Sequence, residues 1–157
     1  MKKLSHLDTN GSALMVDVRE KEISHRVAIA KGTIMMDPET CQMISDSSIK
    51  KGDVIATARI TGIMATKKTA ELIPLCHPLN ITKVEINFEI KDQKGMIICR
   101  AVVETEGKTG VEIEAINAVQ ISLLTVYDMC KAVDRGMEIR DVGLEHKSGG
   151  KSGVWER

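Results

Sequence analysis

The order of hydrophobic patterns along the chain predicts an α+β domain, in which an antiparallel sheet carries two main helices on one face. Three observations support this class. The patterns follow the order strand, helix, strand, strand, helix, strand. A short turn-like linker joins the two middle strands, and 157 residues suffice for one domain with its own core. This order is typical of the split βαβ, or ferredoxin-like, arrangement.

The predicted elements are, in chain order, a strand over 25–36, a short helix over 38–45, a longer helix over 52–71, an extended connector over 73–79, a strand over 81–90, a partner strand over 95–105, the longest helix over 110–134 and a last strand over 137–147.

Proline and glycine give the local signals in the first half. Apolar residues alternate in the first strand, and Pro38 then occupies a favoured first position of a helix. The longer helix shows helical spacing of its apolar residues, and we expect it to bend near Gly62. Pro74 and Pro78 exclude a helix after it, so the connector should be rigid and extended.

The second half contains the clearest strand pair, because apolar and polar residues alternate plainly and "KDQKG" is a hairpin-like linker. The longest helix begins behind Thr109 and ends before Gly136, which are reasonable start and stop signals. We expect one domain over residues 1–157, with flexible arms at about 1–14 and 148–157.

Composition excludes several classes of protein. The 22 Lys and Arg residues balance 22 Asp and Glu residues, which argues against nucleic acid or a membrane surface as partner. Phe88, Tyr127 and Trp155 are the only aromatic residues, too few for a base-stacking platform. The four cysteines form no CxxC pair, which disfavours a zinc site or a redox dithiol. Without a signal peptide or a run of about 18–20 apolar residues, we expect a cytoplasmic protein.

Asp128 and Lys131 stand one helical step apart within an apolar helix. As a surface ion pair they would contribute little to stability, and structural roles explain such helix charges more often than function does. The alternative is an acid and an amine placed where water is partly excluded, as proton transfer requires. Glu112 and Glu114 lie at the other end of this helix. Glu114 is roughly 21 Å from Asp128 at 1.5 Å per residue, so a site using both ends would be shared between chains.

Several basic residues are candidate anion ligands. "KSGGKSG" (147–153) lacks P-loop spacing and a following helix, but Lys147 and Lys151 could close on an anion. Lys51, beside Gly52 at a helix start, is a better candidate because free amides and the helix dipole converge there. A solvated surface position is the simpler alternative for each lysine.

His77 is held between Cys76 and Pro78 in a rigid segment. A ligand-facing role and a structural role are equally compatible with this position. A metal pair of Cys76 and His77 is disfavoured, because adjacent residues seldom chelate one ion and no third ligand is spaced nearby.

Five blocks resemble the cyclic pyranopterin monophosphate synthases, the C proteins of molybdenum cofactor biosynthesis. The resemblance extends from about residue 5 to residue 153. The blocks are "MVDV" (15–18), "KGDVIATARITGIMATKKTAELIPLCHPL" (51–79), "EGKTGVEIEA" (106–115), "TVYDMCKAVD" (125–134) and "KSGGKSG" (147–153).

The resemblance implies a ferredoxin-like subunit in a homo-hexamer, a trimer of dimers with active sites between subunits. It implies conversion of 3′,8-cyclo-7,8-dihydroguanosine triphosphate to cyclic pyranopterin monophosphate, with release of pyrophosphate. We expect no cofactor and no metal site, and the sequence leaves open whether Mg²⁺ accompanies the triphosphate.

The resemblance also implies roles for individual residues. The family's catalytic pair falls on Asp128 and Lys131, and we expect Lys131 to act as general acid and base with its pKa tuned by burial and by Asp128. Ile113 stands where relatives often carry Met, which should not harm an apolar contact. The residues that match substrate-binding positions are Leu75, Cys76, His77, Ile113, Glu114, Glu112, Lys51, Lys67, Arg26 and Lys147.

Two other classes of function remain as alternatives. Ferredoxin-like domains often serve as small-ligand sensing modules, which would bind a nucleotide without turnover. A nucleic-acid-binding module would use the lysine clusters, and its binding would depend on salt.

Overall fold

The computed structural model describes residues 6–50 and 52–157. The elements are β1 (Ser24–Met35), α1 (Pro38–Ser45), α2 (Val54–Leu72), β2 (Ile81–Lys91), the 3-10 helix η1 (Asp92–Lys94), β3 (Met96–Gly107), α3 (Glu112–Cys130), β4 (Glu138–Ser148) and β5 (Trp155–Glu156).

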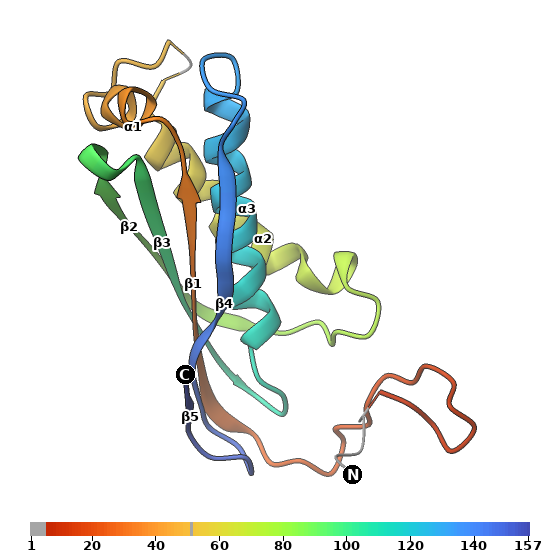
Figure 1. The fold of residues 1–157 in the computed structure, drawn as a ribbon. Helices are drawn as coiled ribbons and strands as arrows, with labels where there is room; N and C mark the ends of the chain where they lie inside the picture. Colours follow the sequence, from red (N-terminus) through yellow and green to blue (C-terminus); the bar gives the residue numbers. More distant parts are fainter. Residues whose placement is uncertain (1–5, 51) are drawn as a thin grey trace.

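The strands form one antiparallel sheet in the order β2-β3-β1-β4-β5. Figure 1 shows α2 and α3 side by side against one face of this sheet. The first four strands therefore have the split βαβ arrangement, and the predicted α+β, ferredoxin-like class is confirmed. Five strands and three α-helices appear in the described residues. Of these, only β5 was not predicted from the sequence.

The core lies between the helices and the sheet. Alternate residues of the two central strands are fully buried there, including Ala28 and Ala30 on β1 and Cys99 and Ala101 on β3. Because side chains alternate across a strand, one face of each strand enters the core and the other faces away. This alternation explains why the strands could be predicted from the sequence.

Gly62 lies at a close contact between α2 and α3. A Cβ at this position would overlap the Ser122 hydroxyl and come within 2.6 Å of Ile86 Cδ1. The Ser122 hydroxyl donates to Ala58 O at 3.1 Å, and the Thr61 and Thr125 hydroxyls lie 2.8 Å apart. Helix α2 continues through this position, so the glycine permits close packing of two helices instead of interrupting one.

The largest differences from expectation lie at the end of α3 and in the C-terminal tail; the other predicted ends are within two residues. Helix α3 ends at Cys130, four residues earlier than predicted, because the chain turns over 131–133. Asp134 holds this turn, and its carboxylate accepts from the amides of Gly136 and Asp37. The C-terminal tail, expected to be a flexible arm, contains β5, which pairs with β4.

Candidate functional site

A cavity of about 360 Å³ lies where the connector after α2 meets the first turn of α3; we call it the ring cavity. Six of the substrate-binding residues expected from the sequence line it. They come from two segments separated by more than 30 positions in the sequence, and β2 and β3 bring these segments together. The predicted residues are Leu75, Cys76, His77, Glu112, Ile113 and Glu114, and the others that line the cavity are His6, Val16, Val18, Lys21, Leu79, Thr109 and Gly110.

Glu114 is the buried acid of the ring cavity, with 4% of its surface exposed. Burial raises the pKa of its carboxyl to about 7, although its own backbone amide opposes the shift and the charge of Glu112 adds to it. The Cys76 thiol also has a raised pKa, because it is partly buried and because Glu114 is negative nearby. Near neutral pH, the Glu114 carboxyl can therefore either donate or accept a hydrogen bond.

A smaller cavity of about 150 Å³ adjoins the ring cavity and shares Lys21, Thr109, Gly110 and Glu112 with it. Lys147 also lines it, and its Nζ lies 2.6 Å from Glu112 Oε1. Both side chains of this pair are about three-quarters buried, so the pair connects the two cavities in a partly dry place.

Arg26 forms the inner wall of the smaller cavity. Only 9% of the residue is exposed, because its Nε donates to Gly107 O at 2.8 Å and its Nη2 to Lys108 O at 3.2 Å. These carbonyls belong to the end of β3 and the loop before α3. The guanidinium is therefore held in one orientation beside Lys147 and Glu112.

One lysine expected in the site lies elsewhere, and another cannot be compared with the structure. Lys67 lies on α2 and lines a separate hollow of about 480 Å³, which shares only Leu79 with the ring cavity. Lys51 lies outside the described residues.

Asp128 and Lys131 form an ion pair of 2.6 Å at the end of α3, with side chains 63% and 53% exposed. They line none of the cavities described above. The hydrogen bond to Asp128 raises the pKa of Lys131, followed by the coulombic effect of the same carboxylate. In the single chain the pair is largely exposed, so the expectation that burial tunes this lysine stays a prediction for an assembled site.

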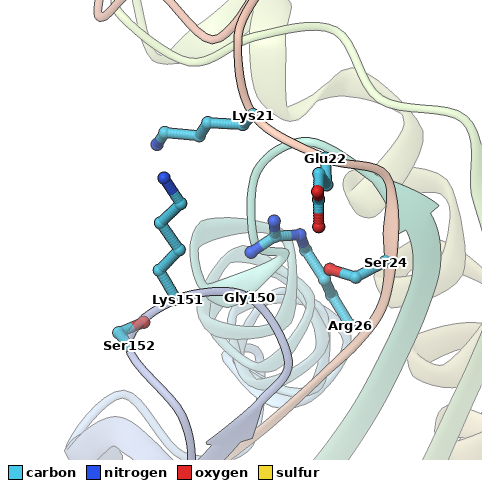
Figure 2. A pocket seen from close by; sticks show the side chains of 7 residues that line it. All are labelled: Lys21, Glu22, Ser24, Arg26, Gly150, Lys151 and Ser152. Atoms are coloured by element: carbon cyan, nitrogen blue, oxygen red, sulfur yellow. The ribbon is translucent and has the colours of Figure 1, made fainter.

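Lys21 lines both the ring cavity and the smaller cavity, and Ser152 lines the smaller one, but neither residue was singled out from the sequence (Figure 2). Lys21 follows an exposed turn in a segment without periodicity. Its only signal was its closeness to the block at 15–18.

No set of three or more His, Cys, Asp or Glu side chains within residues 6–50 and 52–157 is arranged to hold a metal ion. None of the helices in the described part of the chain combines the length and the apolarity needed to cross a bilayer.

The fold and the site define a class: a ferredoxin-like α+β protein with a ligand cavity built from carboxyl groups and fixed cations. Comparison with known proteins identifies the family. A model of the MoaC family matches residues 15–150, and the chain belongs to that family. This is the family of the cyclic pyranopterin monophosphate synthases, which serves molybdenum cofactor biosynthesis.

Among solved structures, the chain is similar to a mutant of the ferredoxin protease FusC in complex with Arabidopsis ferredoxin. The identity is 12%, the match covers 66% of this chain and 10% of the other, and the TM-score is 0.32. The chain thus spans about a tenth of that protein's length, and a similarity of this extent supports no conclusion about function.

Proposed function

We propose that this protein converts 3′,8-cyclo-7,8-dihydroguanosine triphosphate to cyclic pyranopterin monophosphate and releases pyrophosphate. In this proposal it acts as a lyase in the cytoplasm. The observation that carries the proposal is the convergence of the loop at 75–77 with Glu112, Ile113 and Glu114 on one cavity. Membership of the MoaC family supports the same reaction.

The chemistry of the cavities suits such a substrate. A guanine-derived ring presents both donors and acceptors, and the Glu114 carboxyl, with a pKa of about 7, can match either. The triphosphate needs fixed cations, and Arg26 and Lys147 stand beside the ring cavity to provide them. Mg²⁺ would enter only as a companion of the triphosphate.

The catalytic pair needs a second chain in this proposal. Glu114 and Asp128 are separated by roughly 21 Å along α3, so one chain cannot bring both to a small ligand. We therefore propose a homo-hexamer, a trimer of dimers, in which the Asp128–Lys131 pair of one subunit covers the ring cavity of another.

In this proposal Lys131 acts first as a general acid and then as a general base. Paired with Asp128, the amine enters the reaction as an ammonium, which donates a proton to a developing anion. It can then take a proton back once substrate and the neighbouring subunit exclude water. Asp128 orients the amine at 2.6 Å in both steps.

Turnover of the cyclo-dihydroguanosine triphosphate tests this proposal, followed by pyrophosphate release and by the fluorescence of the oxidised pterin. We expect Lys131→Ala to abolish turnover and to leave the free energy of unfolding close to that of wild type, because an exposed pair contributes little. Lys68→Ala is the matched control, since Lys68 pairs with Glu71 at the same i,i+3 spacing on α2. A folded Lys131→Ala protein with normal turnover would exclude the proposed role.

A further inference from the structure

The turn that follows α3 begins at Lys131 and is closed by a buried carboxylate; we call residues 131–134 the end turn. The last residue of α3 is Cys130, so Lys131 stands just beyond the helix, with φ −56° and ψ −17°. On the helix side, Lys131 N donates to Tyr127 O at 2.8 Å. The helix thus fixes the Lys131 backbone from one side, and the other side depends on the residues that follow.

Asp134 closes the end turn and is almost fully buried, with 7% of its surface exposed. Its backbone amide donates to Cys130 O at 3.1 Å, and that of Val133 donates to the same oxygen at 2.9 Å. Its two carboxylate oxygens accept from different amides, Oδ1 from Gly136 N at 2.9 Å and Oδ2 from Asp37 N at 2.8 Å. One residue therefore joins the end of α3, the segment before β4 and the segment after β1.

Asp37 is a fixed point for this contact, because the chain is hydrogen-bonded on both sides of it. Before it, Met36 N donates to Gly95 O at 2.8 Å, in the hairpin between β2 and β3. After it, Cys41 N donates to Asp37 O at 3.0 Å, in the first turn of α1. Figure 1 shows the end of β1, helix α1 and the last turns of α3 at the same end of the molecule. The end turn is therefore held by the sheet as well as by α3.

A carboxylate suits Asp134 because both partners of its side chain are backbone N–H donors. An asparagine would offer one oxygen and would turn its own N–H group toward the second amide. The negative end of the α3 dipole disfavours an anion at this position, so charge attraction to the helix does not explain the residue. The geometry of the end turn, which needs an acceptor for each of two amides, does explain it.

The backbone of the end turn determines where the Lys131 amine lies. Its Nζ donates to Asp128 Oδ1 at 2.6 Å, and Asp128 lies within α3, one helical step earlier. This contact requires Lys131 to keep a helical backbone just beyond the end of the helix. The Lys131 side chain is 53% exposed, so packing alone does not hold the amine in place.

We propose that Asp134 is a positioning residue, which holds the end turn and so keeps the Lys131 amine on Asp128. The part of the pair in turnover rests on the proposed function, whereas the positioning of Lys131 does not. Proton transfer depends closely on geometry, since a displacement of about 1 Å can lower a rate by about 100-fold. The ring cavity lies at the other end of α3, so loss of this positioning should lower kcat far more than it raises KM.

Removing the Asp37 amide tests this contact and leaves the charge of Asp134 unchanged. Asp37 has φ −62° and ψ 138°, angles that proline adopts and that suit a residue before Pro38. Asp37→Pro removes the N–H donor, and Asp37→Ala, which keeps it, is the matched control. The Asp37 side chain makes no capping hydrogen bond, so the control should behave as wild type. We expect Asp37→Pro to lower kcat by about tenfold or more.

Substitution of Asp134 itself should give a graded loss. Asp134→Ala removes both acceptors and Asp134→Asn removes one, so we expect kcat to fall by about 100-fold in the first and about tenfold in the second. A role in folding alone would lower kcat in proportion to the folded fraction, which circular dichroism measures. Ser122→Ala is the control for lost stability, because it removes a buried hydrogen bond from the middle of α3 and should leave kcat of the folded protein unchanged.

The pKa of Lys131 gives a readout that needs no substrate. The hydrogen bond to Asp128 raises this pKa above 10.5, and the charges of Asp128 and Tyr127 add to the effect. NMR titration of the lysine Cε signals, with Lys131 assigned by its loss in Lys131→Ala, should show a lower pKa in Asp37→Pro and Asp134→Asn. It should show no change in Asp37→Ala. Because Asp37→Pro keeps the Asp134 carboxylate, a lower pKa there reports the position of the amine and not a lost charge.

The two proposals fail in different ways. If the wild type does not turn over the cyclo-dihydroguanosine triphosphate but Asp37→Pro lowers the pKa of Lys131, the proposed function falls and the positioning role stands. If the wild type turns over and Lys131→Ala does not, an unchanged kcat and an unchanged Lys131 pKa in Asp37→Pro and Asp134→Asn would overturn the positioning role alone. Should Asp134→Ala fail to fold, these two milder variants decide the question.

Discussion

The buried environment of Glu114 disfavours the charged carboxylate, so the stability of the fold depends on pH. The pKa is about 7 in the folded chain against an ordinary value of 4.5, so folding favours the protonated form. The stabilisation is complete below pH 4.5 and is lost as the pH rises through 7. Above that pH the fold carries a buried carboxylate beside Glu112.

Glu114→Gln should therefore change the pH dependence of stability. Between pH 5 and pH 8 we expect the free energy of unfolding of the variant to rise relative to wild type by roughly 2 kcal/mol, because the amide does not titrate. Urea denaturation at a fixed protein concentration at several pH values measures the difference. Glu39→Gln, at an exposed carboxylate on α1, should show no such trend. If the difference in free energy of unfolding between Glu114→Gln and wild type does not change with pH, this carboxyl is well solvated in the folded chain.

At the same scale, residue type and resemblance predicted Cys76, His77, Glu112 and Glu114 in the site, and the structure brings them together. Lys21 could not be predicted, because its role depends on a segment without periodicity folding over the loop before α3. The exposure of Asp128 and Lys131 could not be predicted from the sequence either. Helical spacing places the two residues on one face of the helix but does not show what covers that face.

Among the elements, the close contact between α2 and α3 at Gly62 can be tested by substitution. Gly62 allows the Ser122 hydroxyl to reach Ala58 O. Gly62→Ala should lower the free energy of unfolding by roughly 1–2 kcal/mol, because overpacking outweighs the better helix propensity of alanine, worth about 1 kcal/mol.

Urea denaturation of Gly62→Ala and Gly136→Ala measures the free energy of unfolding of each variant relative to wild type. A Cβ on Gly136 meets nothing closer than 3.5 Å, so this control should remain close to wild type. Increased stability of Gly62→Ala would show that the helices separate easily at this point.

The four long strands were predicted well, whereas the end of α3 and the short strand β5 were not. The alternation in β2 and β3 has a direct cause, because one face of each strand is buried against the helices. The end of α3 depends on Asp134 accepting from Asp37, a residue 97 positions away. Strand β5 has only two residues and forms because β4 offers a free edge, which no local pattern reveals.

The whole assembly is where the proposed shared site can be tested. We expect native mass measurement to give a particle six times the 17.2 kDa chain. Lys131→Ala and Glu114→Ala should each be inactive alone. If two chains supply these residues to one site, mixed hexamers should regain activity at about a quarter of their sites, because random mixing leaves that share with both native residues.

Refolding the two inactive proteins together and measuring turnover gives the result. Lys131→Ala mixed with Asp128→Ala is the control and should stay inactive, since both changes remove the same pair. If the first mixture regains no activity, Lys131 and Glu114 of the same chain must serve one site. That result would contradict the separation of the two residues along α3.

The sequence by itself determined the order of the elements, the faces they bury and the residue types available for the site, because all of these follow from local period and composition. Only the tertiary structure decided that Lys21, Arg26 and Lys151 meet at one cavity (Figure 2), and that Glu114 is buried while Lys131 is exposed. The physical reason is that charge effects and pKa values depend on distance and on the exclusion of water. Both are set by segments that are far apart in the chain and adjacent only after folding.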